Sequence, residues 1–351
     1  MNEAFERDLL SRLREQYLLR PAMQPQDAVK FVFQGLLGVG HLLASRKAVT
    51  AYITREMDSA EADASEDLCE KLSPGWCRLN LRRAKAEGLG PDAIAGLMLT
   101  SRAGGNFTRK DVLEVCEKLS SEDGKPFDRR ELASVLDENR LPSHSEAYRE
   151  AYCPAYRVIS ADWLPYLNAV LRINGALSGR ERLTVTIDGP CASGKTTLAE
   201  KLAEVFGAAV IHTDDFVIPH AMKTPAHLAI PGGNCDADRL ADEVLAPWMR
   251  GEAVRYRKYD CASDRLLPEE TLPDSRMLII EGCYCNLPRI SRCAEVRLFL
   301  DTPLEEREQR LAVRETAPSL NMFYEKWIPL ENAYFEAFGL PDSGMELISI
   351  R

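Results

Sequence analysis

The sequence predicts two domains in a chain of 351 residues. Residues 176–351 are expected to form an α/β domain with a parallel sheet and flanking helices, preceded by a mainly α-helical domain over residues 1–175. The alternating β-branched segment Leu183–Asp188 predicts a strand, which leads through a glycine-rich loop into a helical apolar repeat. The continuous apolar segment Met277–Glu281 is typical of a strand buried in a parallel sheet. No comparable strand pattern stands out before about residue 155.

The glycine-rich loop, GPCASGKT, fits the pattern G-x-x-x-x-G-K-[ST] of P-loop NTPases. Gly189 and Gly194 allow backbone turns that point N–H groups at phosphate oxygens, and the positive end of the following helix adds to this attraction. We expect Lys195 to bridge the β- and γ-phosphates of a nucleotide and the Thr196 hydroxyl to bind Mg²⁺. The predicted nucleotide-binding residues are Gly189, Pro190, Cys191, Ala192, Ser193, Gly194, Lys195, Thr196 and Thr197.

The bulk composition excludes several kinds of partner. The net charge is −10 and no basic arm or stripe is present, which argues against nucleic acid and against an anionic membrane. The N-terminus is amphipathic and acidic, and no segment approaches the roughly 18 apolar residues of a membrane span. We therefore expect a cytoplasmic protein whose ten cysteines are mostly free thiols. Only Cys283 and Cys285 are close in sequence, and no second pair at zinc spacing accompanies them.

The N-terminal half offers two candidates for chemistry. One is Gly38–His41, where the histidine is more typical of a hydrogen-bonded core residue. The other is the segment SHSEAYREAYCPAYRV, residues 143–158, whose polar aromatic and basic groups fit either a second ligand site or a packed connection between domains. The packed connection is the favoured interpretation. Helices are expected over 1–20, 27–37, 41–57, 76–87, 91–101, 109–119 and 129–138.

Beyond the loop helix, a second strand is predicted over Ala208–His212, and two carboxylates, Asp214 and Asp215, follow it. Ligands of open α/β sheets bind at the carboxyl ends of the strands, so one carboxylate is placed to accept a substrate hydroxyl proton. The alternative is that both only cap the following turn. The proline-rich segment after them carries Asn234, Asp236 and Arg239 as candidates to orient a substrate, although Asp236 could instead cap a helix over 237–250. A short strand is expected within 253–260.

Glu281 ends the strand at 277–281 and is placed to order Mg²⁺, often through water. Another strand is predicted over Val296–Asp301, and a last one over Leu347–Ile350. The helix after Asp301 carries Arg307, Arg310 and Arg314 near one face, where they could close over phosphates. The alternative is salt bridging to glutamates of the same helix.

Taken together, these motifs resemble the uridine kinase family within the phosphoribulokinase, uridine kinase and pantothenate kinase group. The resemblance covers about residues 180–351 and rests on GPCASGKT, HTDDF, GGN-x-D-x-x-R, Tyr259-Asp260, LIIEG and the arginine helix. It implies a kinase that uses ATP and Mg²⁺ to phosphorylate a hydroxyl. Asp214 matches the base, Glu281 the acid of the second motif, and Arg310 and Arg314 the lid arginines. No family resembles the first half.

The function expected from these patterns is transfer of the ATP γ-phosphate to a hydroxyl of a uridine- or cytidine-like nucleoside or a similar small metabolite. The alternatives are a pantothenate- or sugar-phosphate-type kinase and a nucleotide-dependent switch or sensor that acts through the helical domain. ATP turnover that depends on a small acceptor would distinguish a kinase from a switch. The candidate residues are Lys195, Asp214, Arg310 and Arg314 for catalysis, Thr196, Asp214 and Glu281 for the metal, and Asp215, Asn234, Asp236, Arg239, Tyr259 and Asp260 for the substrate.

Overall fold

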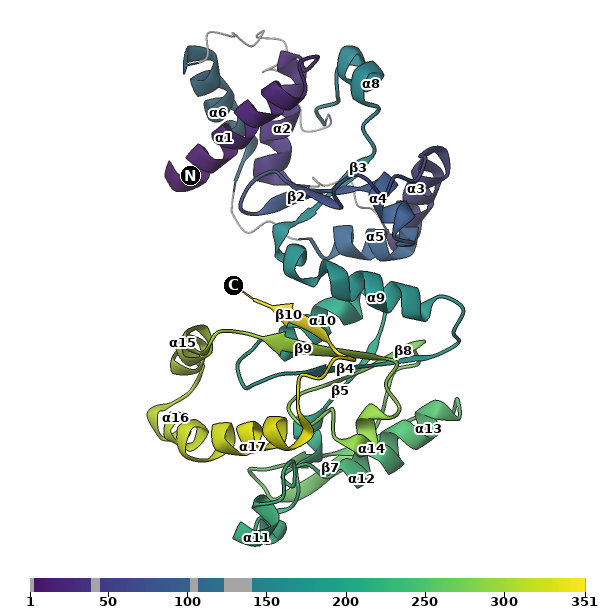
Figure 1. Cartoon of the computed structure of the whole chain (residues 1–351), viewed down its shortest axis with the longest axis vertical. Coiled ribbons are helices and arrows are strands. Elements are labelled where there is room, and N and C mark those ends of the chain that lie inside the picture. Colours follow the sequence, from purple (N-terminus) through teal and green to yellow (C-terminus); the bar gives the residue numbers. More distant parts are fainter. Residues whose placement is uncertain (1–2, 39–44, 102–106, 123–140, 351) are drawn as a thin grey trace. The chain divides into compact units, whose positions relative to one another are not determined.

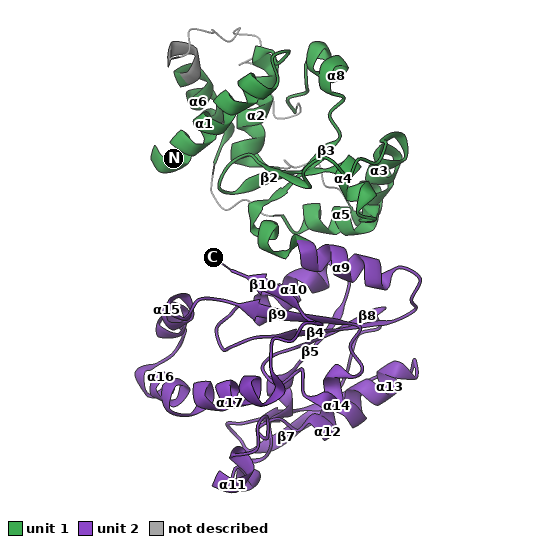
Figure 2. Cartoon of the chain, in the orientation of Figure 1, with its two compact units in different colours: residues 1–167 green, residues 168–351 purple. Residues whose placement is uncertain are grey.

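The computed structural model describes residues 3–38, 45–101, 107–122 and 141–350. The chain divides into two compact units, residues 1–167 and residues 168–351, which are described separately (Figure 2). His41 and the helix expected over 129–138 lie outside the described residues. Within the described residues, no helix is long and apolar enough to cross a membrane.

The first unit is rich in helices but also contains a small antiparallel sheet, which the sequence analysis missed (Figure 1). The sheet has the order β1–β2–β3, and the helix expected over 76–87 begins only at Leu81 because Trp76–Asn80 is the central strand. Its strands are β1 (Cys69–Lys71), β2 (Trp76–Asn80) and β3 (Tyr156–Ser160). Its helices include α1 (Glu3–Leu19), α2 (Pro25–Leu37), α3 (Arg46–Ser59), α4 (Leu81–Ala86), α5 (Pro91–Leu99), α6 (Arg109–Glu122) and α8 (Glu146–Tyr152).

The core of this unit forms where α1, α2 and β2 pack together. Leu9 and Leu13 of α1 are fully buried, and they join Phe31 of α2 and Trp76 of β2 in one apolar cluster. The start of α2 is fixed by Asp27, whose carboxylate accepts the N–H of Gln24 at 2.9 Å, as in other N-terminal capping arrangements. The end of α8 is marked by Cys153, an exposed residue with a left-handed φ of 41°.

The second unit contains the parallel sheet that the sequence predicts. Five strands lie in the order β10–β9–β4–β8–β5, and every neighbouring pair is parallel. In the register of the sheet, Glu281 lies beside both Ile187 and His212, so the strands before the candidate residues end at one edge. The strands are β4 (Leu183–Asp188), β5 (Ala209–His212), β8 (Met277–Glu281), β9 (Val296–Asp301) and β10 (Glu346–Ser349). The α/β fold class is thus confirmed.

Helices flank this sheet, and a two-stranded hairpin follows the proline-rich segment (Figure 1). The helix expected over 237–250 contains a π-helical turn over Ala241–Leu245, next to Pro247, which has no N–H to donate within a regular helix. The hairpin consists of β6 (Arg255–Asp260) and β7 (Arg265–Thr271). The helices are α9 (Leu167–Leu177), α10 (Lys195–Phe206), α11 (Pro225–Leu228), α12 (Ala237–Leu240), α13 (Ala246–Met249), α14 (Pro288–Ser291), α15 (Leu304–Arg314), α16 (Ala317–Met322) and α17 (Ile328–Phe338).

Candidate active site

The glycine-rich loop connects the central strand β4 to helix α10, which begins at Lys195. Gly189 has a φ of 140°, and a Cβ at this position would lie 2.5 Å from the carbonyl oxygen of Leu300. Gly194 caps α10 in the left-handed region, with a φ of 100°. Both positions therefore need glycine, one for space and conformation and the other for conformation.

The Lys195 side chain bends back over the glycine-rich loop that precedes it. Its ammonium donates hydrogen bonds to the carbonyl oxygens of Gly189 and Pro190, at 2.8 and 2.9 Å. Burial opposes its ionisation, but nearby acidic groups, Glu331 foremost and then Cys283 and Asp188, raise the pKa of Lys195 above its ordinary value. The loop therefore carries a firmly protonated cation, as binding of a polyphosphate requires.

Glu331 is a member of this site that the sequence analysis missed. It lies on α17, and its Oε2 accepts the N–H of Cys191 in the loop at 2.8 Å. The side chain is buried, and desolvation raises its pKa, although Lys195 and the Cys191 N–H act in the opposite direction. No local pattern marks this residue, because its contact with the loop is made by tertiary packing.

Thr196 and Glu281 meet at the carboxyl edge of the sheet. The Thr196 hydroxyl donates to Glu281 Oε1 at 3.0 Å, and His212 Nδ1 lies 2.5 Å from the same oxygen. The hydrogen bond to Glu281 raises the pKa of His212. A hydroxyl and a carboxylate are ligands that Mg²⁺ prefers, and this ion commonly takes its remaining ligands from water and phosphate. Within the described residues, no group of three or more His, Cys, Asp or Glu side chains could hold a metal alone.

Asp214 and Asp215 lie in a short 3₁₀ turn, Thr213–Phe216, directly after β5. Asp214 faces a cavity of about 610 Å³, which Lys195, Thr196 and Glu281 also line. Desolvation by the surrounding protein raises the pKa of Asp214, and Glu281 adds to this effect, whereas Lys195 opposes it. Asp215 is not among the residues that line the cavity, and its Oδ2 is buried without a hydrogen-bond partner in the described structure.

Two of the predicted arginines line the same cavity. Arg310 donates to the carbonyl oxygen of Ala192 in the loop at 3.0 Å and to Glu306 at 3.1 Å. Arg314 pairs with Glu315 at 2.7 Å. Arg310 thus has a glutamate partner on its own helix while it contacts the glycine-rich loop, whereas Arg314 pairs with the residue directly after the helix.

The predicted substrate residues separate into two groups. Asn234 lines the cavity, and its Oδ1 is buried without a hydrogen-bond partner in the described structure. Asp236 instead caps α12 by accepting the N–H of Arg239 at 3.1 Å. The Arg239 guanidinium lies 4.2 Å from the Phe216 ring centroid and donates to the carbonyl oxygen of Asp215 at 2.8 Å. Neither Asp236 nor Arg239 lines the cavity.

Tyr259 and Asp260 lie at the turn of the β6–β7 hairpin rather than on the cavity wall. The Tyr259 hydroxyl donates to Asp264 and accepts the N–H of His220 at 3.3 Å. Asp260 accepts the N–H of Ala262 at 3.0 Å and thereby closes the turn. These hydrogen bonds fix the hairpin.

A buried hydrogen-bond network around Asp188 fixes the end of β4, where the glycine-rich loop begins. Asp188 accepts the N–H of Gly189 at 2.8 Å, the Nδ2 of Asn286 at 3.1 Å and the hydroxyl of Tyr334 at 2.8 Å. Tyr334 in turn accepts the N–H of Asn286 at 3.1 Å and is fully buried. The base of the loop is therefore tied to α17, the helix that also carries Glu331.

Comparisons with known proteins find similarity to several kinases. No protein-family model matches. A cytidylate kinase from Mycoplasmopsis pulmonis (strain UAB CTIP) is 24% identical over 166 residues, which are 42% of this chain and 75% of the relative. Among solved structures, a possible uridine kinase from Bacillus stearothermophilus has 20% identity and a TM-score of 0.41, with 53% of this chain and 96% of that chain covered. A sugar kinase from Janibacter sp. HTCC2649 has 20% identity and a TM-score of 0.27, with 48% and 84% covered.

A protein described as a possible uridine kinase is among these similar structures. The cytidylate kinase and the possible uridine kinase match 42% and 53% of the chain, respectively. The three proteins are all named as kinases, and their named substrates differ.

Proposed function

We propose that residues 168–351 form a kinase that uses ATP and Mg²⁺ to phosphorylate a small molecule. The observation that carries this proposal is the cavity at the carboxyl edge of the parallel sheet. It brings together the loop lysine Lys195, the oxygen pair Thr196 and Glu281, and the carboxylate Asp214. A loop cation, a Mg²⁺-type oxygen pair and a separate carboxylate are the parts that phosphoryl transfer to an acceptor needs.

The loop side of the cavity suits the triphosphate. The Lys195 ammonium would exchange its bonds to loop carbonyls for β- and γ-phosphate oxygens, and Arg310 lies close enough to the loop to neutralise charge on the same group. Thr196 and Glu281 would hold Mg²⁺, which lowers the charge repulsion between the phosphates and the attacking oxygen. Free thiols at all ten cysteines are consistent with a reducing compartment such as the cytoplasm.

The acceptor we propose is a hydroxyl compound, with a uridine- or cytidine-like nucleoside as the first candidate. Asp214 would accept the proton of the attacking hydroxyl, and its raised pKa improves its basicity for that task. The unpartnered Oδ1 of Asn234 on the cavity wall offers a hydrogen-bond acceptor to orient the hydroxyl compound. The sequence relative named as a cytidylate kinase supports a second candidate, a nucleoside monophosphate acceptor.

The test is ATP consumption by the purified full-length protein with a panel of acceptors. The panel contains uridine, cytidine, other nucleosides, cytidylate, pantothenate and sugar phosphates. Lys195→Ala is the blank, and Lys201→Ala, on the same helix but outside the cavity lining, is the matched control. Stimulation by one acceptor, lost in Lys195→Ala and kept in Lys201→Ala, is the expected result. ATP hydrolysis that no acceptor stimulates would refute the kinase proposal and favour a nucleotide-dependent switch.

A further inference from the structure

The first unit contains a cavity of its own, with a volume of about 920 Å³. Pockets for small organic ligands typically measure roughly 300–1,000 Å³. Its walls come from α2, α3 and the chain around β3, and they include the aromatic side chains of Phe33, Tyr52 and Tyr156. All of its lining residues belong to the first unit. The cavity therefore belongs to the first unit alone.

The ionisable lining of this cavity is mostly positive. Lys30, Arg149 and Arg157 line it, whereas Glu56 is the one acidic residue among the described lining residues. Glu56 forms an ion pair with Arg157, so two positive side chains, Lys30 and Arg149, have no carboxylate partner among the described lining residues. In a chain whose net charge is −10, such a wall favours an anion.

Lys30 is the cation whose charge is least compensated. Its ammonium forms no ion pair within the described residues and lies 5.9 Å from the Tyr156 ring centroid. Burial lowers the pKa of Lys30 to about 8, and Arg78, Arg157 and Arg149 act in the same direction, opposed by Asp27. A half-buried ammonium among like charges is costly, and an anionic ligand would reduce that cost.

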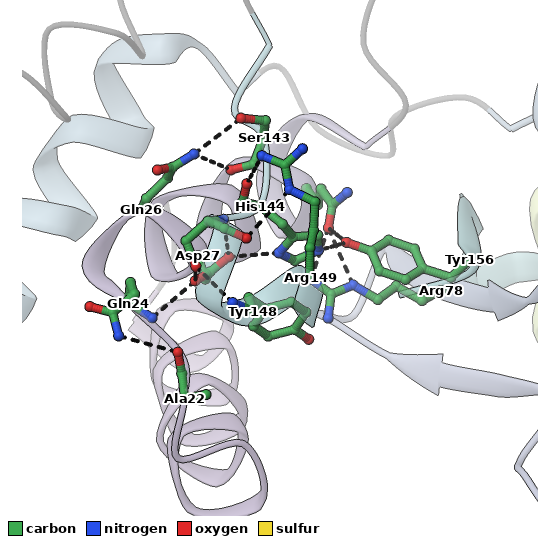
Figure 3. A network of polar contacts seen from close by, with 12 residues as sticks. Ala22, Gln24, Gln26, Asp27, Arg78, Ser143, His144, Tyr148, Arg149 and Tyr156 are labelled. Carbon is green, nitrogen blue, oxygen red and sulfur yellow. Dashed lines mark hydrogen bonds and ion pairs between the residues drawn. The ribbon is translucent and has the colours of Figure 1, made fainter. Parts of the chain in front are cut away.

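A hydrogen-bonded chain of side chains, Asp27, His144 and Tyr156, supports one wall of the cavity (Figure 3). Asp27 Oδ1 lies 2.7 Å from His144 Nδ1, and His144 Nε2 lies 2.6 Å from the Tyr156 hydroxyl. Desolvation lowers the pKa of His144 to about 4, so its ring is neutral at physiological pH. Arg149, from α8, donates to the carbonyl oxygen of His144 at 2.7 Å, which keeps it beside the same wall (Figure 3). Because His144 is neutral, the positive charge on the cavity wall comes from lysine and arginine side chains.

We propose that this cavity binds a phosphate monoester of about the size of a nucleoside monophosphate. A monoester near neutral pH carries close to two negative charges, which match Lys30 and Arg149, the two cations without a carboxylate partner in the part of the lining that the structure describes. Arginine forks and lysine ammonium groups are the usual phosphate ligands in proteins. The volume is much larger than a bare phosphate needs, and Phe33 and Tyr52 offer apolar surface for the organic part.

This proposal gives the segment at residues 143–158 a role. Ser143, His144 and Arg149 line the cavity, as do Cys153, Tyr156 and Arg157 further along the same segment. It is therefore a ligand wall rather than only a connection between domains. The proposal is independent of the kinase function, since it concerns residues of the other unit.

The test is isothermal titration calorimetry, which measures the heat of binding when the full-length protein is titrated with a probe. The three probes are uridine 5′-monophosphate, ribose 5-phosphate and inorganic phosphate. We expect saturable binding of at least one of the two organic probes with a Kd below about 1 mM. Tighter binding of the nucleotide identifies a nucleotide ligand, and tighter binding of the sugar phosphate identifies a sugar phosphate. No binding of either organic probe at 5 mM, or equal affinity for all three probes, would overturn the proposal.

Three single-residue variants test whether the probe binds in this cavity. Lys30→Met keeps the stem of the side chain but removes the charge, and it should weaken binding by about tenfold or more, the loss expected for a charge-assisted contact. Arg149→Gln tests the same wall at an exposed residue, where misfolding is not expected. Lys110→Met, an exposed residue of α6 outside the lining, should change affinity by less than about twofold.

The phosphate loop is the competing location for the probe. Binding that survives Lys195→Met and is lost in Lys30→Met and Arg149→Gln places the ligand in the first unit. Binding that survives Lys30→Met and is lost in Lys195→Met places it in the loop and overturns the proposal. The melting temperature of each variant without probe shows whether it is folded.

Discussion

The hydroxyl of Tyr334 gives a sharp test of how the phosphate loop is supported. In Tyr334→Phe, the Asp188 carboxylate loses the donor at 2.8 Å and the Asn286 N–H loses its acceptor at 3.1 Å, both in a fully buried place. Leaving a buried polar group without its partner costs about 1–3 kcal/mol, and Asp188 keeps two other donors. We therefore expect the free energy of unfolding of the second unit to fall by about 2–3 kcal/mol.

Urea unfolding of the full chain, followed by circular dichroism, measures this change. Hydrogen exchange in β4 identifies the transition that belongs to the second unit. Tyr324→Phe is the matched control because Tyr324 is 42% exposed, and it should change stability by less than about 0.5 kcal/mol. A fall of less than about 0.5 kcal/mol in Tyr334→Phe, at an unchanged m value, would refute the role assigned to this hydroxyl.

Four further predictions concern the two units. Lys195→Ala should abolish phosphoryl transfer and weaken ATP binding in a titration; wild-type turnover would remove the argument from the loop. Asp214→Asn should bind ATP but lose at least about 10²-fold in rate, and near-normal activity would move the role of base to Asp215. Because the pKa of Asp214 is raised, the wild-type rate should fall with decreasing pH already above the ordinary aspartate range, as a pH–rate profile would show. The pKa of His144 is lowered from 6.5 to about 4, so unfolding takes up a proton between these values. Acid should therefore cost the first unit on the order of 3 kcal/mol between pH 6.5 and pH 4, a loss that urea titrations would show to be absent in His144→Gln.

The sheet of the second unit could be predicted closely from the sequence. The predicted strand Leu183–Asp188 matches β4, and Val296–Asp301 matches β9. Both are rich in β-branched or aliphatic residues, which are typical of strands buried in a parallel sheet. The strand β2 could not be found in the same way, because its buried run contains Arg78, so its sequence forms neither a continuous apolar run nor a regular alternation.

The candidate site was predicted where the chemistry depends on a local motif. Lys195 and Thr196 belong to one continuous pattern, and both line the cavity. Asp236 shows the limit of such patterns, since an aspartate before a helix fits a cap as well as a ligand, and in the structure it is the cap. Glu331 could not be found, because it contacts the loop from a helix about 140 residues later in the chain.

The position of Cys153 makes the first unit easy to study by chemical labelling. Of the ten cysteines, Cys153 and Cys261 are exposed, whereas burial raises the pKa of others, such as Cys191, to about 11 and keeps them protonated and unreactive. Cys153 borders the first-unit cavity, and Cys261 borders the cavity of the second unit. In a chain with Cys261 and the half-buried Cys69 and Cys293 replaced by serine, a fluorophore on Cys153 would therefore report events in the first unit.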